Sequence, residues 1–199
     1  MENNLEKKNG PLSAKTDVNN FYNKEKGIQV AHADSFTPTI NYYFTGAGTA
    51  AKSESVNTEY YNLIVGYDPF DKDHFLIDRS RALTEGMADE VKAKFCGWSE
   101  DQIAEIKKLP AIITDERNRN AVSEQQGVLA FIKSIRFQQN GIMVYFQRYF
   151  PVPMQVLQDR NFDLGMYSEW ELNRTHWAIK NIDLMEVLQD AGVAMFPAE

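Results

Sequence analysis

The stretch VLAFIKSIRFQQNGIMVYFQRYF, residues 128–150, decides the fold. β-Branched and aromatic residues run on both sides of Asn140-Gly141, a pair that tolerates positive φ at little cost. The pattern predicts a β-hairpin closed by a primed turn. Apolar neighbours at 131–132 and 144–146 blur the alternation, which indicates a bulge or burial on both faces. A hairpin alone is not stable in water, so we expect other elements to cover it.

The chain around the hairpin predicts an α+β protein. We expect a small curved antiparallel sheet, or an SH3-like barrel, built on the hairpin with short helices packed against it. Residues 1–20 are polar, rich in Asn and Lys, and contain almost no large apolar side chain, which predicts a disordered tail. Residues 21–199 are expected to form a single α+β domain.

Composition narrows the possible partners. The formal net charge is −7, which argues against broad binding to nucleic acid or to an anionic membrane surface. A local basic face made by Lys133, Arg136 and Arg148 keeps nucleic-acid binding as a third hypothesis. No window approaches the roughly 18 apolar residues needed to span a bilayer, the start of the sequence has no apolar leader, and Cys96 is the single cysteine. These features predict a cytoplasmic protein without a membrane partner.

A glycine-containing segment precedes the hairpin. Residues 39–44 and 60–67 read as strands, and residues 46–51 between them (Gly46 to Ala51) match G-x-G-x-x-A, with Asp68 about 20 residues further on. This resembles a dinucleotide-binding fingerprint. However, residues 52–58 offer one apolar side chain and no amphipathic stripe. A loop between two antiparallel strands is the interpretation we favour.

Residues 68–74 place Asp68, Asp71, Asp73 and His74 close together. The spacing lacks the glycine and the distal glutamate of a calcium loop, so a solvated turn explains it without a metal. We therefore assign no metal and no cofactor from the sequence.

Helix signals occur on both sides of the hairpin. Residues 87–95 predict a helix followed by Gly97 at the C′ position, and Ser99 with Gln102 forms a capping box for a second helix that Pro110 ends. A short strand is expected at 111–114, another at 175–179, and helices at 154–164 and after Asn181 as N-cap.

The candidate binding residues are polar or aromatic groups near the ends of these elements. The crowded segment around His176 is the best candidate recognition surface; His176 is either a general base or a core histidine bonded to a backbone carbonyl, and we favour the second. No catalytic residue is assigned. The full set of candidates is Arg79, Arg81, Glu116, Arg174, His176, Trp177 and Lys180.

From Leu63 onward the sequence contains a series of short motifs, namely Gly66-Tyr67-Asp68-Pro69, Asp78-Arg79-Ser80-Arg81, Leu109-Pro110-Ala111-Ile112 with Glu116, Gly127-Val128, and residues 171–184. In this order they resemble a family of small bacterial domains, some of them linked to phage-defence or other conflict gene products. That family has no established activity, so the resemblance implies neither a catalytic set nor a cofactor.

Together these observations favour a non-enzymatic recognition module that binds another protein or a small ligand. The alternative is a nucleotide-binding protein or an enzyme that uses the turn at residues 46–51 or a pair formed by Glu116 and His176.

Overall fold

The computed structural model describes residues 39–40, 54–118, 122–167 and 169–193. The predicted tail (1–20) and the glycine-containing turn (46–51) lie outside these residues. The elements in chain order are β1 (Thr39–Ile40), β2 (Glu54–Ser55), β3 (Tyr61–Val65), β4 (His74–Ile77), η1 (Arg79–Arg81), α1 (Asp89–Phe95), α2 (Glu100–Lys108), β5 (Pro110–Thr114), β6 (Gln126–Gln138), β7 (Gly141–Pro153), α3 (Met154–Asp159), η2 (Glu169–Asn173), β8 (His176–Lys180) and α4 (Leu184–Asp190).

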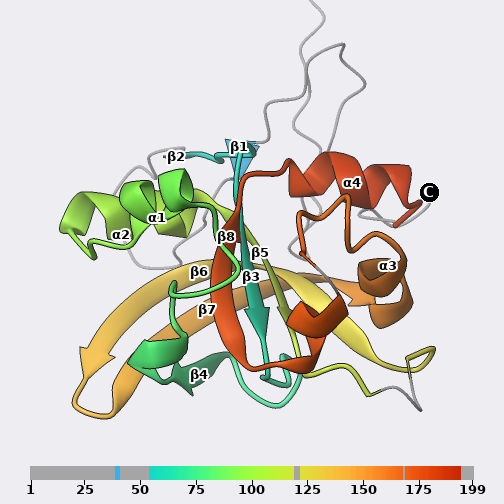
Figure 1. The fold of residues 1–199 in the computed structure, drawn as a ribbon, viewed down its shortest axis with the longest axis horizontal. Helices are drawn as coiled ribbons and strands as arrows, with labels where there is room; N and C mark the ends of the chain where they lie inside the picture. Colours follow the sequence, from blue (N-terminus) through green and yellow to red (C-terminus); the bar gives the residue numbers. More distant parts are fainter. Residues whose placement is uncertain (1–38, 41–53, 119–121, 168, 194–199) are drawn as a thin grey trace, which may run out of the picture.

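The predicted hairpin is confirmed as β6 and β7, the two long curved strands in Figure 1. Their register shifts at Leu129/Ala130 and at Ile132/Ser134, which are the irregularities that the blurred alternation predicted.

The hairpin turn differs from the prediction. Gln138 pairs with Gly141, so Gln139 and Asn140 are the two turn residues, and neither has a positive φ. The prediction of a primed turn is therefore wrong. Gly141 instead lies against β4, where a Cβ atom would be 2.5 Å from the carbonyl oxygen of Ile77. Close approach of the neighbouring strand and a φ of 158°, rather than a primed turn, favour glycine here.

The sheet is mixed rather than wholly antiparallel. Its strand order is β4-β7-β6-β5-β3-β8, and β3 pairs in parallel with β5. The connection between these two strands contains β4 and both short helices, and a long crossover of this kind is what a parallel pair needs. The expected pairing of the strand at 60–67 with the one at 39–44 is not seen in the described residues, because β3 lies between β5 and β8 and Thr39–Ile40 pairs with β2.

The sheet curls into a half-barrel, as the prediction of an α+β fold with a curved sheet required. The segment that follows β4 and η1 reaches the opposite edge strand, β8. Ala82 forms a parallel bridge with Trp177, and the Leu83 amide donates to the Trp177 carbonyl oxygen at 2.8 Å. In Figure 1 this green segment passes beside β8.

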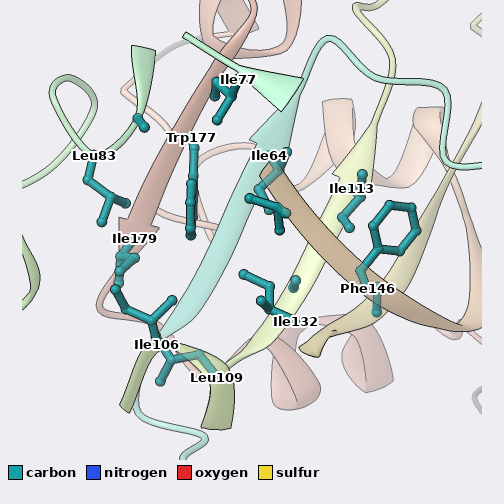
Figure 2. Packing of buried hydrophobic residues seen from close by; sticks show 14 of the residues in the cluster. Ile64, Ile77, Leu83, Ile106, Leu109, Ile113, Ile132, Phe146, Trp177 and Ile179 are labelled. Carbon is teal, nitrogen blue, oxygen red and sulfur yellow. The ribbon is translucent and has the colours of Figure 1, made fainter. Parts of the chain in front are cut away.

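Both faces of the sheet are covered, which explains why all five residues of β3 are buried. One face packs against α1 and α2 through residues that include Val91, Phe95 and Ile106; Figure 2 shows Trp177 among the side chains of this α1–α2 core. The other face packs against α3, η2 and α4 through residues that include Leu157 and Leu184, and we call this the α3–α4 core.

Some of the predicted helix caps and helix ends agree with the structure and others do not. The capping box of Ser99 and Gln102 is confirmed, but the left-handed residue after α1 is Trp98 (φ 56°) and not Gly97. Asp183, rather than Asn181, caps α4 by accepting from two backbone amides, and α3 ends at Asp159. Within the described ranges, no helix is both long and apolar enough to cross a membrane.

Candidate functional site

Strand β8 places two ionisable side chains on one face of the sheet. Because side chains alternate along a strand, His176, Ala178 and Lys180 face one way, and Trp177 and Ile179 face into the α1–α2 core. His176 and Lys180 are nevertheless buried, with 2% and 5% of their side chains exposed. Buried polar groups of this kind need partners.

The segment after η1 supplies the first wall of the site. Gly86 has a φ of 69°, and its carbonyl oxygen accepts a hydrogen bond from Nζ of Lys180. A Cβ atom at Gly86 would lie 2.8 Å from Oε2 of Glu171. Both the left-handed backbone and the close approach therefore favour glycine at this position.

The turn η2 supplies the opposite wall and the acidic partner. Oε2 of Glu171 lies 2.6 Å from Nζ of Lys180, and Oε1 accepts a 2.7 Å hydrogen bond from the Tyr167 amide. Only 12% of the Glu171 side chain is exposed. The pair is thus a largely buried salt bridge with a backbone hydrogen bond that holds the carboxylate in place.

His176 is held by the backbone and leaves one ring nitrogen without a hydrogen bond. Nδ1 lies 2.8 Å from the Arg174 carbonyl oxygen, which accepts only, so Nδ1 carries the proton. Nε2 lies 3.5 Å from Oε2 of Glu171 and has no hydrogen-bond partner among the described residues. This is the buried histidine bonded to a backbone carbonyl that the sequence favoured.

Burial and ion pairing shift the pKa values of Glu171 and Lys180 in opposite directions. Burial alone would raise the pKa of the Glu171 carboxyl group, but contacts with the His176 ring and the Lys180 ammonium outweigh burial and lower that pKa. Burial lowers the pKa of Lys180, and Glu171 offsets only part of the effect.

These side chains form the floor of a pocket of about 520 Å³. Its mouth carries two highly exposed aromatic residues, Tyr167 (97%) and Trp170 (71%). Arg174 stands beside them, and its Nη2 lies 2.8 Å from Oε2 of Glu85. The lining residues are Glu85, Gly86, Met87, Ala88, Gly165, Tyr167, Trp170, Glu171, Arg174, His176 and Lys180.

Three of the seven residues proposed from the sequence, Arg174, His176 and Lys180, line this pocket. Arg81 contacts the lining residue Glu85. Glu116 contacts Thr175, which lies in sequence between the lining residues Arg174 and His176. Arg81 lies 3.2 Å from Oε1 of Glu85. Oε1 of Glu116 accepts hydrogen bonds from the amide and the hydroxyl group of Thr175.

The remaining two residues lie elsewhere. Arg79 donates to the Gln138 carbonyl oxygen at the tip of the hairpin. Trp177 has no exposed surface and donates its indole N–H to Oδ1 of Asn62, so its proposed role as a contact residue is corrected to a core role. The acid that approaches His176 is Glu171, whereas Glu116 is hydrogen-bonded to Thr175.

Sequence reasoning missed Glu85, Gly86 and Glu171. One signal was available for Glu171: strand alternation puts His176 and Lys180 on the same face, and a buried lysine needs an acidic partner. The chain contains 28 acidic residues, however, and only the tertiary structure identifies which of them is the partner.

The charged residues do not suggest a metal centre. In the part of the chain that the structure describes, no group of three or more His, Cys, Asp or Glu side chains is placed to hold a metal ion. In the acidic segment, Asp68 accepts from the Phe70 amide, and Asp73 lies 2.9 Å from Nδ1 of His74. The first of these contacts is the turn chemistry expected of an Asp-Pro segment.

No family model, curated protein or solved structure matches this chain. The description of this protein therefore rests on its fold and its site alone. It is an α+β protein with a curled mixed sheet and, at the edge strand β8, a pocket with a charged floor and an aromatic mouth.

Proposed function

We propose that this protein is a non-enzymatic recognition module and that it binds a small ligand in the pocket beside β8. The observation that carries the proposal is the combination of exposed aromatic residues at the mouth with buried, mutually paired charges at the floor. Small-molecule sites typically combine apolar and aromatic walls with a few fixed polar groups, in cavities of about 300–1,000 Å³.

Hydrogen bonds hold the charged floor of the pocket in place, which suits the recognition of a ligand. Glu171 is held by Lys180 and by the Tyr167 amide, and His176 is held by the Arg174 carbonyl oxygen. Preorganised polar groups lower the cost of ordering a site when a ligand binds.

An acid–base enzyme is the second candidate function. An imidazole nitrogen and a carboxylate oxygen lie 3.5 Å apart, on Nε2 of His176 and Oε2 of Glu171, in a pocket that a substrate of suitable size would fit. The turn at residues 46–51 remains the basis of a nucleotide-binding alternative. A protein partner, in place of a small ligand, would have to approach the same mouth through Tyr167 and Trp170.

The resemblance to bacterial conflict domains is the basis for a proposed biological role. We infer a role in bacterial or phage conflict, in which the module senses a small molecule in the cytoplasm. The single cysteine, Cys96, is compatible with a reducing compartment.

The test uses a variant that fills the pocket without removing a charge. Ala88 lines the pocket and is exposed at the N-cap of α1, so Ala88→Phe should block the mouth. Ala93→Phe, on an exposed helix position outside the pocket lining, is the matched control. We expect a thermal-shift screen of metabolites, including nucleotides, to give a ligand that stabilises the wild type and Ala93→Phe but not Ala88→Phe.

Recovery of the ligand separates the two candidate functions. After prolonged incubation with the protein, a recognition module returns the ligand unchanged, whereas an enzyme returns product. Ligands that stabilise Ala88→Phe as strongly as the wild type would show that the pocket is not the binding site.

A further inference from the structure

Among the described residues, one buried acceptor atom in the floor of the pocket has no hydrogen-bond partner. Nε2 of His176 is buried, and with Nδ1 protonated it presents a lone pair. Its neighbour, Oε2 of Glu171, is also an acceptor and offers it no hydrogen while the imidazole is neutral. A buried acceptor without a hydrogen-bond partner costs free energy, and a ligand group that donates a hydrogen bond to Nε2 would remove that cost.

A donor with spare capacity lies next to that acceptor. The Lys180 ammonium has three N–H groups, and its hydrogen bonds in the described ranges go to the Gly86 carbonyl oxygen and to Oε2 of Glu171. Nζ of Lys180 and Nε2 of His176 both approach the same carboxylate oxygen, at 2.6 and 3.5 Å. A hydroxyl group both donates and accepts, so a single hydroxyl matches this pair of nitrogens.

The charges of the lining favour a neutral ligand. In the lining, two acids, Glu85 and Glu171, are paired with two bases, Arg174 and Lys180. Glu85 also contacts Arg81, which lies outside the lining. A strongly charged ligand would have to break one of these pairs, which leaves a partly buried charge without its partner.

The aromatic mouth favours a ligand with a flat, apolar face. The side chains of Tyr167 and Trp170 expose ring surfaces. Packing of another ring against them contributes a favourable free energy of binding. Sugar rings and nucleosides both combine such a face with hydroxyl groups.

We propose, on the basis of the proposed function, that the ligand is a neutral hydroxylated ring, either a free sugar or the ribose of a nucleoside. One of its hydroxyl groups donates to Nε2 of His176 and accepts from Nζ of Lys180. The flat face of the ligand packs against Trp170 and Tyr167.

Calorimetric titration of the full chain tests this assignment. One arm uses glucose, galactose, mannose and N-acetylglucosamine, and the other uses adenosine, guanosine, cytidine and uridine with free ribose as the reference. The best ligand is then replaced by its monodeoxy analogues. We expect the loss of one particular hydroxyl to weaken binding at least about tenfold, because a site built around a hydroxyl discriminates strongly against its absence.

His176→Phe keeps an aromatic ring and removes both nitrogens. It should weaken binding of the parent ligand about tenfold and abolish the difference between the parent and the sensitive deoxy analogue. A ¹⁵N NMR measurement on the wild type gives the same information without a variant: the Nε2 resonance should shift with the parent ligand and not with that analogue. Equal affinity for all monodeoxy analogues, or an unchanged Nε2 resonance, would overturn the proposal.

The two proposals fail in different ways. Suppose that no sugar or nucleoside binds, but that a compound of another class binds the wild type and does not bind Ala88→Phe. The assignment of a hydroxylated ring is then wrong, and the pocket is still the binding site. If Ala88→Phe blocks no ligand of any class, the pocket itself is the wrong site.

Discussion

Glu171 is the residue on which the charge balance of the pocket depends. Its carboxylate contacts Lys180, the His176 ring and the Tyr167 amide, while only 12% of its side chain is exposed. The net result is a lowered pKa for this group relative to its ordinary value of 4.5. A group whose pKa is lowered by folding stabilises the fold above its unfolded pKa, and this contribution disappears as the pH falls through the folded pKa.

We therefore predict that Glu171→Gln is destabilising by about 2 kcal/mol at neutral pH. The difference from the wild type should shrink as the pH falls from 4.5 towards the lower pKa of the folded state, because the carboxyl group becomes protonated first in the unfolded chain and then in the folded protein. Thermal unfolding of both proteins across the acidic range measures the difference. Glu124→Gln, at an exposed loop position, is the control and should follow the wild type. A constant difference at every pH would contradict the assignment.

At the scale of single residues, the sequence predicted the types of side chain in the site better than their partners. Arg174, His176 and Lys180 were recognisable because charged and imidazole groups crowd a short aromatic segment. Trp177 was misassigned because alternation turns it to the other face of β8, where it packs in the α1–α2 core. Glu85 approaches these residues only through long-range folding, whereas Glu171 precedes Lys180 by nine residues and is placed by the turn between η2 and β8.

The hairpin of β6 and β7 is the element that the sequence predicted best. Its extent follows from two runs of β-branched and aromatic residues, and its bulges follow from the blurred alternation. The conformation of its turn did not follow, because the requirement for Gly141 comes from β4, a strand far away in sequence.

This explanation predicts a contrast between two adjacent residues. Gly141→Ala should destabilise the protein by about 2 kcal/mol, because its Cβ would overlap the Ile77 carbonyl oxygen. Asn140→Ala should cost less than about 0.5 kcal/mol, because residue 140 has no positive φ to maintain. Urea unfolding of both variants measures the two values. A cost at Asn140 as large as that at Gly141 would contradict this account, because it would indicate a positive φ at residue 140.

At the scale of the whole molecule, a buried polar contact connects separate elements. Nδ2 of Asn62 donates to the Ile106 carbonyl oxygen at 3.1 Å, and Oδ1 accepts from the Trp177 indole at 3.0 Å. These contacts join β3, α2 and β8. Trp177 also meets Ala82 in the bridge that links the segment after η1 to the edge strand.

We predict that Trp177→Phe lowers the free energy of unfolding by about 3 kcal/mol, because it leaves Oδ1 of Asn62 unpaired and opens a cavity in the α1–α2 core. If residues 21–199 form one domain, far-UV circular dichroism and exchange of the α4 amides should report one shared urea midpoint in the wild type and in the variant. Trp170→Phe, at an exposed position, is the control and should change stability by less than about 0.5 kcal/mol. Separate midpoints for the two probes would indicate two folding units.

The sequence by itself determined the hairpin, the capping box at Ser99, the short strands β5 and β8, and the α+β class with a curved sheet. Each of these depends on residues that are neighbours in the chain, where strand alternation and helix capping act directly. The tertiary structure decided the parallel pairing of β3 with β5, the conformation around Gly141, and the pocket. Its walls come from residues 85–88 and from Gly165, Tyr167, Trp170 and Arg174, and its floor comes from Glu171 and β8. Contacts between segments so far apart depend on which strands the sheet brings side by side, and no local pattern records that arrangement.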